Sequence, residues 1–232
     1  MSFIEVDTES GKENSLLTGN AEGQRGMALI SGGIDSPVAS WIMMRNGKSL
    51  DFVHFHSYPF SCSASIEKAK DLFLSISKKR QCRLYMVPFL PLQEAVLRNV
   101  PNRLRIVVYR RAMAMIAERI ASSNGSSFLV TGDSLGQVSS QTLQNLATVD
   151  QAVSMPIIRP LIGFDKTEII EIAKSIGTYD ISIRPHEDCC TLFSSGNPAT
   201  KTSPGQVEAE EKRMGIEKLV EECLGKAELA DF

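Results

Sequence analysis

The residues best suited to chemistry form one hexad, Ser31–Ser36, with the sequence Ser-Gly-Gly-Ile-Asp-Ser. It follows a short apolar run, Met27–Ile30, and precedes a helical pattern that opens at Pro37. Glycines let a backbone approach a phosphate closely, and the start of a helix offers N–H groups and a positive dipole end. Ser36 suits the N-cap position and Pro37 the first helical position. The hexad therefore predicts an anion-binding turn.

Asp35 indicates that the anion carries a metal ion. A carboxylate beside a phosphate is repelled unless a divalent cation lies between them, so Asp35 favours a magnesium nucleotide. The Walker loop is excluded, because Ile42 stands where that motif needs its first glycine before Gly47-Lys48-Ser49. The hexad instead resembles the signature of the PP-loop ATP pyrophosphatases, in which a substrate oxygen attacks the α-phosphate and pyrophosphate leaves. A serine-glycine turn without a ligand is the alternative.

Other candidate residues follow two further predicted strands. Adenine needs an apolar slot and main-chain hydrogen bonds, and four strand-end residues can supply both: Leu29, Ile30, His54 and Phe55. For His54, an ordinary half-buried strand histidine is an equal alternative. Thr131–Gln141 is a second glycine-rich crossing from strand to helix. Because one nucleotide contacts several strand ends, two such crossings together indicate a nucleotide more strongly than either does alone.

Arginines gather in the middle of the chain, at Arg98, Arg103, Arg105, Arg110, Arg111 and Arg119. Guanidinium groups suit phosphate, whether of ATP or of an RNA backbone. We expect a solvated helix face with acidic partners to account for three of the six. Arg110 is the best candidate for a ligand contact.

Cys189 and Cys190 are adjacent, and neighbouring cysteines bridge each other only with backbone strain. A thiol near Arg184 and His186 can have a lowered pKa and act as a nucleophile or persulfide carrier, but two intervening acids oppose this. The residues alone therefore favour buried, inert thiols. The same structural interpretation applies to the other three cysteines, Cys62, Cys82 and Cys223.

The composition is that of an ordinary globular chain. Its 232 residues, 43% of them hydrophobic, suffice for one sizeable α/β domain. The net charge of −2 gives no general attraction to nucleic acid, so RNA contact requires a local patch. No run approaches the roughly 20 apolar residues of a membrane helix, and the acidic start does not match a signal peptide. Five cysteines without disulfide spacing fit a reducing cytosol, and we expect a cytoplasmic protein.

Alternating strands and helices must position these residues. Strands are expected at 27–30, 50–55, 83–89 and 128–131, with an extended segment at 156–161, and helices at 37–46, 64–79, 104–122, 138–148, 165–176 and 206–224. This order predicts a doubly wound, mainly parallel sheet with helices on both faces and a ligand outside the carboxyl ends of its strands. Residues 1–26 are expected to be a flexible leader, 27–224 the nucleotide-binding domain, and 225–232 a tail.

Taken together, the motifs resemble the tRNA 4-thiouridine synthetases, tRNA sulfurtransferases that also serve thiamine biosynthesis. The resemblance covers about residues 27 to 213 and rests on six stretches: 29–39, 53–60, 130–143, 159–163, 177–179 and 187–190. It implies a PP-loop enzyme that uses ATP and Mg²⁺ to adenylate O4 of the uridine at position 8 of tRNA. Sulfur from the persulfide of a cysteine desulfurase then displaces AMP and gives 4-thiouridine.

The resemblance also implies roles for individual residues. By matching position, ATP would be held by Leu29, Ile30, His54, Phe55, Arg110, Gly132 and Gln141. Pyrophosphate would be held by Ser31, Gly32, Gly33, Asp35 and Ser36, with Asp35 near Mg²⁺. Cys189 falls on the family's catalytic cysteine. The resemblance therefore implies a catalytic thiol at this position, where the residues alone favour a buried, inert one.

The chain departs from the family pattern at both ends. Family members carry an N-terminal ferredoxin-like part and a THUMP domain that grips tRNA, and some add a C-terminal rhodanese domain; we expect all of these to be absent here. A fragment, a split enzyme and a stand-alone paralogue stay open, as does a homodimer, and tRNA binding would need a THUMP-type domain. Two other functions also stay open: another adenylating PP-loop chemistry, such as amidation with ammonia, and a non-catalytic nucleotide-binding subunit.

Overall fold

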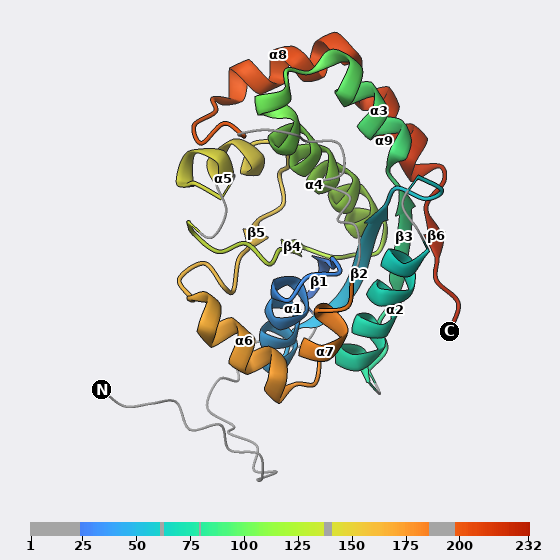
Figure 1. Ribbon diagram of the computed structural model, residues 1–232. Coiled ribbons are helices and arrows are strands. Elements are labelled where there is room, and N and C mark those ends of the chain that lie inside the picture. Colours follow the sequence, from blue (N-terminus) through green and yellow to red (C-terminus); the bar gives the residue numbers. More distant parts are fainter. Residues whose placement is uncertain (1–23, 61–62, 79, 137–140, 186–197) are drawn as a thin grey trace.

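The computed structural model describes residues 24–60, 63–78, 80–136, 141–185 and 198–232, and a twisted sheet runs through their centre (Figure 1). Its strands are β1 (Arg25–Leu29), β2 (Ser49–His56), β3 (Leu84–Pro88), β4 (Phe128–Val130), β5 (Ile157–Ile158) and β6 (Glu228–Leu229). They lie in the order β5-β4-β1-β2-β3-β6, and every pairing is parallel except that of β6 with β3. The predicted doubly wound, mainly parallel sheet is confirmed.

Helices cover both faces of this sheet. They are α1 (Asp35–Arg45), α2 (Ala64–Ser77), α3 (Leu90–Asn99), α4 (Arg105–Ser123), α5 (Leu143–Asp150), α6 (Lys166–Ser175), α7 (Tyr179–Ser182), α8 (Pro204–Met214) and α9 (Ile216–Leu224), with a 3₁₀ turn at Asn102–Leu104. In Figure 1, α3, α4, α8 and α9 lie above the sheet, and α1, α2, α6 and α7 lie below it. None of the helices in the described part of the chain has both the length and the apolar character needed to cross a membrane.

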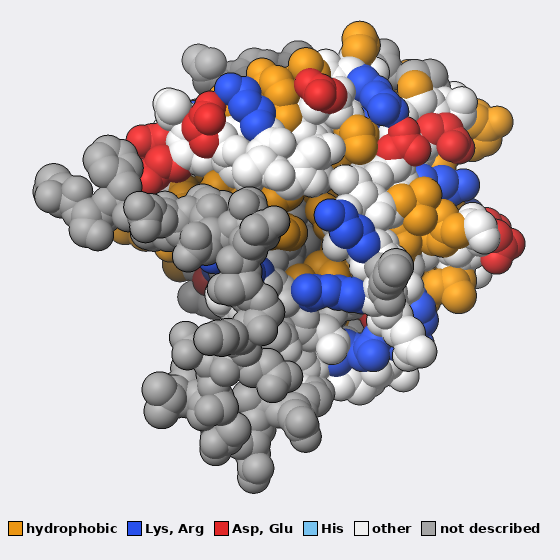
Figure 2. Space-filling view, turned by 90° about the horizontal axis from the view of Figure 1, so that it is seen from below, with side chains coloured by type: hydrophobic (Ala, Val, Ile, Leu, Met, Phe, Trp, Pro, Cys, Tyr) orange, Lys and Arg blue, Asp and Glu red, His pale blue; other side chains and the backbone are white. Residues whose placement is uncertain are grey.

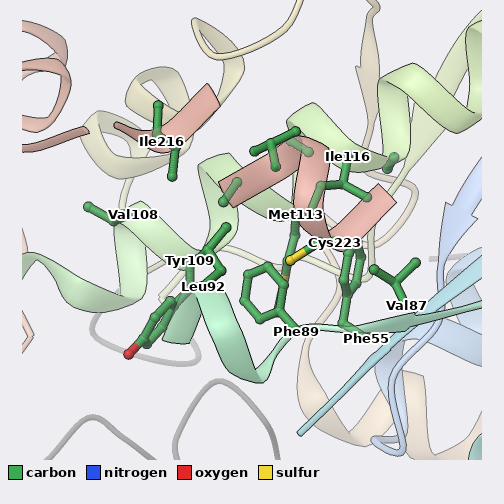
Figure 3. Close-up of a cluster of buried hydrophobic side chains, with 14 of the residues drawn as sticks. Phe55, Val87, Phe89, Leu92, Val108, Tyr109, Met113, Ile116, Ile216 and Cys223 are labelled. Carbon is green, nitrogen blue, oxygen red and sulfur yellow. The ribbon is translucent and has the colours of Figure 1, made fainter. Parts of the chain in front are cut away.

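The upper core is built around aromatic rings (Figure 3). Phe89 lies between Phe55 and Tyr109 in edge-to-face contacts, with ring centroids 5.3 and 6.2 Å apart. The thiol of Cys223 lies in the same cluster, where burial, and then the charge of Glu222, raise its pKa to about 11. Cys223 is therefore the structural thiol that the sequence predicts.

The lower core packs α1, α2 and α6 against the other face of the sheet through Val38, Leu72 and Ile169, which are fully buried. Seen from below, the outer surface of this layer has Lys and Arg side chains around its middle and acidic side chains mainly toward its upper border (Figure 2).

Several element boundaries differ from those predicted. Helix α3 was not predicted, and the expected helix 206–224 is two helices, because Gly215 (φ 68°) adopts the left-handed conformation that ends α8. Helix α5 begins at Leu143, since the Thr142 side chain caps it by accepting the N–H of Asn145; residues 138–140 of the predicted helix lie outside the described part. The strand β6 lies within the expected tail.

Candidate nucleotide site at the carboxyl edge of the sheet

The hexad Ser31–Ser36 joins β1 to α1. Ser36 is not the N-cap. Helix α1 begins at Asp35, two residues before the predicted first position Pro37, and Ile34 lies at the cap position without a side-chain cap bond. The Ser36 hydroxyl turns back into the loop instead, where it accepts the N–H of Ser31 at 2.8 Å. The Ser31 hydroxyl in turn accepts the N–H of Gly33 at 3.2 Å. The two serines thus fold the loop onto itself and hold its backbone in a defined shape.

Asp35 contacts a residue that the sequence analysis did not single out. Lys166 Nζ lies 2.5 Å from Asp35 Oδ1, and both side chains are partly exposed. Lys166 is the first residue of α6, whose start is fixed by a capping box between Asp165 and Glu168. The capping pattern predicts where α6 begins, but no periodicity links it to a loop more than a hundred residues away. The fold brings together a carboxylate and an ammonium beside the glycine turn.

The predicted adenine residues lie at the ends of β1 and β2. Buried His54 places Nδ1 2.9 Å from the carbonyl oxygen of Ile30, so the ring ties the two strand ends together. The side chain of Phe55 belongs to the upper core, and half-buried Leu29 packs against the same cluster. For Phe55 only the backbone is therefore available to a nucleotide.

Asp133 is the centre of the loop that follows β4. Its carboxylate pairs with Arg110 from α4 and with Arg159, whose Nε lies 3.2 Å from Oδ2. The Thr131 hydroxyl and the Gln141 amide donate to the same carboxylate at 2.9 and 3.4 Å. Two predicted ATP ligands, Arg110 and Gln141, therefore meet on one carboxylate that the sequence analysis did not identify.

Asp133 keeps its negative charge although its carboxylate is buried. Burial raises the pKa of this carboxyl, but the charge of Arg110, the Thr131 hydroxyl and the charge of Arg159 together outweigh burial and lower it. Asp133 is therefore ionised near neutral pH. Arg159 also pairs with Asp150 through both of its terminal nitrogens. Arg110 binds Asp133 through Nη2, so the guanidinium group of Arg110 retains donors at the carboxyl edge of the sheet.

Gly132 is where the loops after β1 and β4 touch. A Cβ built on Gly132 would lie 2.6 Å from the backbone nitrogen of Ser36 and 2.8 Å from its Cα, closer than real side-chain contacts allow. Only glycine lets the second crossing pack against the start of α1. Position 132 is a glycine because the backbones of the two loops approach each other closely there.

Replacing Gly132 by alanine is expected to lower the free energy of unfolding by about 1–3 kcal/mol, because the new methyl meets backbone that has no alternative rotamer. ATP affinity should fall at least about tenfold, since the hexad must shift to make room. Chemical denaturation and calorimetric titration measure the two effects. Gly163→Ala is the matched control, as a Cβ there meets nothing within 4 Å. Equal behaviour of the two variants would contradict the packing argument.

Three of the six clustered arginines have acidic partners away from this site. They are Arg98 with Glu94, Arg111 with Glu211, and Arg119 with Glu217 and Glu221. This agrees with the expected number, although Arg111 is buried rather than solvated. Successive residues of a helix point about 100° apart, so Arg110 and Arg111 reach different surroundings.

Part of the predicted site lies outside the described residues. Cys189, Cys190 and the loop residues 137–140 fall there, as does Cys62. Within the described ranges, no group of three or more His, Cys, Asp or Glu side chains is arranged to hold a metal ion.

A parallel sheet with a Ser-Gly-Gly-Ile-Asp-Ser turn after β1 and a second glycine crossing after β4 defines a nucleotide-binding fold of the PP-loop ATP pyrophosphatase type. A family model described as thiamine biosynthesis protein (ThiI) matches residues 21–216. The chain therefore belongs to the ThiI family.

Relatives with curated names support this assignment. The chain is 48% identical over 206 residues to a probable tRNA sulfurtransferase of Moorella thermoacetica, covering 88% of this chain and 53% of that protein. It is 45% identical over 226 residues to a probable tRNA sulfurtransferase of Caldanaerobacter subterraneus, covering 93% and 60%. The chain thus spans between half and two thirds of the length of these relatives.

Solved structures show the same fold. A 4-thiouridine synthetase–RNA complex with bound ATP superposes with a TM-score of 0.85 at 41% identity, covering 89% of this chain and 55% of that one. An NMN synthetase from Francisella tularensis superposes with a TM-score of 0.55 at 14% identity, covering 88% and 84%. The second likeness concerns the fold alone.

Proposed function

We propose that this chain is the ATP-dependent part of a tRNA sulfurtransferase. It adenylates O4 of the uridine at position 8 of tRNA, and sulfur replaces this oxygen to give 4-thiouridine. The same sulfur chemistry links the protein to the thiazole of thiamine. The observation that carries the proposal is the meeting of the hexad, Lys166 and the Asp133 network at one sheet edge, in a fold that matches an ATP-bound 4-thiouridine synthetase.

The phosphates of ATP would occupy the hexad. The Ser31–Gly33 contact is an exposed hydroxyl-to-amide bond, which a phosphate oxygen can replace at little cost. Ser31, Gly32, Gly33 and Ser36 then hold the pyrophosphate group, and Lys166 adds a positive charge next to it. This arrangement fixes the leaving group and leaves the inner phosphorus open to attack by the uridine oxygen.

Asp35 would hold Mg²⁺ between its carboxylate and the phosphates. Its position at the start of α1, with 26% of the side chain exposed, fits a cation bound by one carboxylate and several outer ligands. When bound, the ion neutralises charge that develops on the departing pyrophosphate. The chain itself orients Asp35 through the first turn of α1 and through Lys166.

The adenosine end would lie between β1, β2 and β4. Leu29, Ile30, His54 and Phe55 supply the apolar slot and backbone groups for adenine. Arg110, Gly132 and Gln141 close the site from the side of β4. Asp133, which also pairs with Arg159, holds Arg110 in position. The adenylated oxygen is a far better leaving group than a pyrimidine oxygen, which is what makes the second step accessible.

Cys189 would act in the second step, as a nucleophile or carrier of the displacing sulfur. The sulfur donor is the persulfide of a cysteine desulfurase, and tRNA is gripped by a THUMP-type domain in the same protein or in a partner. The Lys and Arg side chains near the middle of the face in Figure 2 would contact the RNA backbone. We further propose that the protein acts in the cytoplasm and that a homodimer is an allowed assembly.

The direct test is to incubate the chain with unmodified tRNA, Mg-ATP and a persulfide source, with and without a THUMP-type domain. The RNA is then digested and its nucleosides are separated by mass. We expect 4-thiouridine together with release of pyrophosphate. Absence of both with the complete mixture, in a protein that is folded, would contradict the proposal.

Cys189→Ser separates this function from its alternatives. We expect the variant to release pyrophosphate but to make no 4-thiouridine, because only the second step needs the thiol. Full activity of the variant would favour another adenylating chemistry, such as amidation. ATP binding by the wild-type chain without pyrophosphate release would favour a non-catalytic subunit.

A further inference from the structure

Lys68 is a buried lysine that the proposed chemistry does not use. Only 2% of its surface is exposed, and burial, and then the charge of Arg184, lower its pKa. Its ammonium group donates to the carbonyl oxygens of Ser182 at 2.6 Å and Arg184 at 2.7 Å. A buried cation persists where its donors are satisfied, so these short bonds form a firm attachment between α2 and the end of α7.

A second contact strengthens this attachment. One turn after Lys68 on α2, Asp71 accepts a hydrogen bond from the side chain of Arg184 at 2.5 Å. The residues that follow α7 are thus held through their backbone by Lys68 and through a side chain by Asp71. The position of Ser182 is set by α2, a helix of the lower layer.

Ser182 connects α7 to the hexad Ser31–Ser36. Its buried hydroxyl donates to the carbonyl oxygen of Gly33, inside the hexad, at 3.3 Å. The Gly33–Ile34 peptide is trans, and in a planar trans peptide the carbonyl and the following N–H point in opposite directions. With the Gly33 carbonyl directed at Ser182, the N–H of Ile34 faces the opposite side of the loop.

We propose that Ser182, held in place by Lys68, is a positioning residue of the phosphate site: it fixes the Gly33–Ile34 peptide so that its N–H faces the pyrophosphate group of ATP. The inference rests on the proposed function, because it presupposes that the hexad holds this group. Ser182 touches no reacting atom. It acts through the loop backbone, by removing the freedom of one peptide unit to rotate.

Calorimetric titration of the full chain with Mg-pyrophosphate, Mg-ATP and Mg-AMP tests the proposal. Ser182→Ala should weaken the binding of pyrophosphate and of ATP by about 3- to 10-fold, the range expected for the loss of one hydrogen bond. The affinity for AMP should change less than about twofold. Lys68→Met should shift the same two affinities in the same direction. Thermal unfolding of each variant establishes that it is folded at the titration temperature.

Ser175→Ala and Lys70→Met are the matched controls. The Ser175 hydroxyl donates to the carbonyl oxygen of Ile172 in its own helix, and Lys70 is a partly exposed residue of α2 that pairs with Glu67. Both should bind all three probes like the wild-type chain. Unchanged pyrophosphate affinity in Ser182→Ala, or an equal loss for AMP and pyrophosphate, would overturn the positioning role while leaving the proposed function intact. Failure of the wild-type chain to bind pyrophosphate or ATP would instead overturn both.

Discussion

Asp35→Ala is expected to abolish pyrophosphate release in practice: its rate should fall by on the order of 10²–10³-fold, while the fold stays intact. The substitution removes the one carboxylate at the start of α1 and with it the proposed Mg²⁺ ligand. It also leaves Lys166 without its contact at 2.5 Å. Coupled detection of pyrophosphate under single-turnover conditions measures the loss, because it separates the adenylation step from product release.

The stability of the same variant distinguishes a chemical role from a structural one. The Asp35–Lys166 pair is partly exposed at 26% and 46%, and such pairs contribute about 0–1 kcal/mol. We therefore expect a change in the free energy of unfolding below about 1 kcal/mol. Glu171→Ala, which removes an exposed acid 2.8 Å from Lys174, is the control and should keep full activity. Equal pyrophosphate release by both variants would end the metal argument.

The hexad was predictable because its signal is local. An apolar run, a glycine turn and a helix start occur within a dozen residues, and the parallel sheet follows from the alternation of strands and helices. The role of Ser36 was not predictable from the same pattern. Ser, Gly and Asp can each cap a helix, and the choice depends on the turn of the Ser36 hydroxyl toward the N–H of Ser31.

Lys166 and Asp133 could not have been selected from the sequence. Each becomes a site residue through a partner far along the chain, 131 residues away for Asp35 and 23 for Arg110. Composition and periodicity carry no information about such pairs. The same holds for the contacts of Ser182, whose partners Lys68 and Gly33 lie 114 and 149 residues away in the sequence.

Arg111→Ala is expected to cost about 3–5 kcal/mol of folding free energy, because it leaves a buried carboxylate without its partner. Arg111 is 2% exposed and binds Glu211 through two bonds, Nε to Oε1 at 2.7 Å and Nη2 to Oε2 at 3.0 Å. It also donates to the carbonyl oxygen of Thr148, so one side chain joins α4, α5 and α8. Denaturant unfolding of the purified variant measures the loss.

If Arg111→Ala does not fold, the double variant Arg111→Met with Glu211→Leu keeps the prediction testable. Replacing both members of a buried pair by apolar side chains removes the unpaired charge, so stability should return to within about 2 kcal/mol of wild type. The double variant should also bind ATP normally, since the buried pair lies between α4 and α8, and Asp133 is bound by Arg110 instead. Loss of ATP binding in a stable double variant would contradict the interpretation that Arg111 stabilises the fold without taking part in the nucleotide site.

The neighbouring Arg110 should show the opposite behaviour. Removing it leaves Asp133 with Arg159, Thr131 and Gln141, so the fold loses little, while ATP affinity should fall roughly 10- to 100-fold through one charged hydrogen bond. Two adjacent arginines with identical local sequence preferences thus separate into one that binds ligand and one that holds the fold. Unchanged ATP affinity in Arg110→Ala, measured by calorimetry, would mean that the Asp133 network is structural as well.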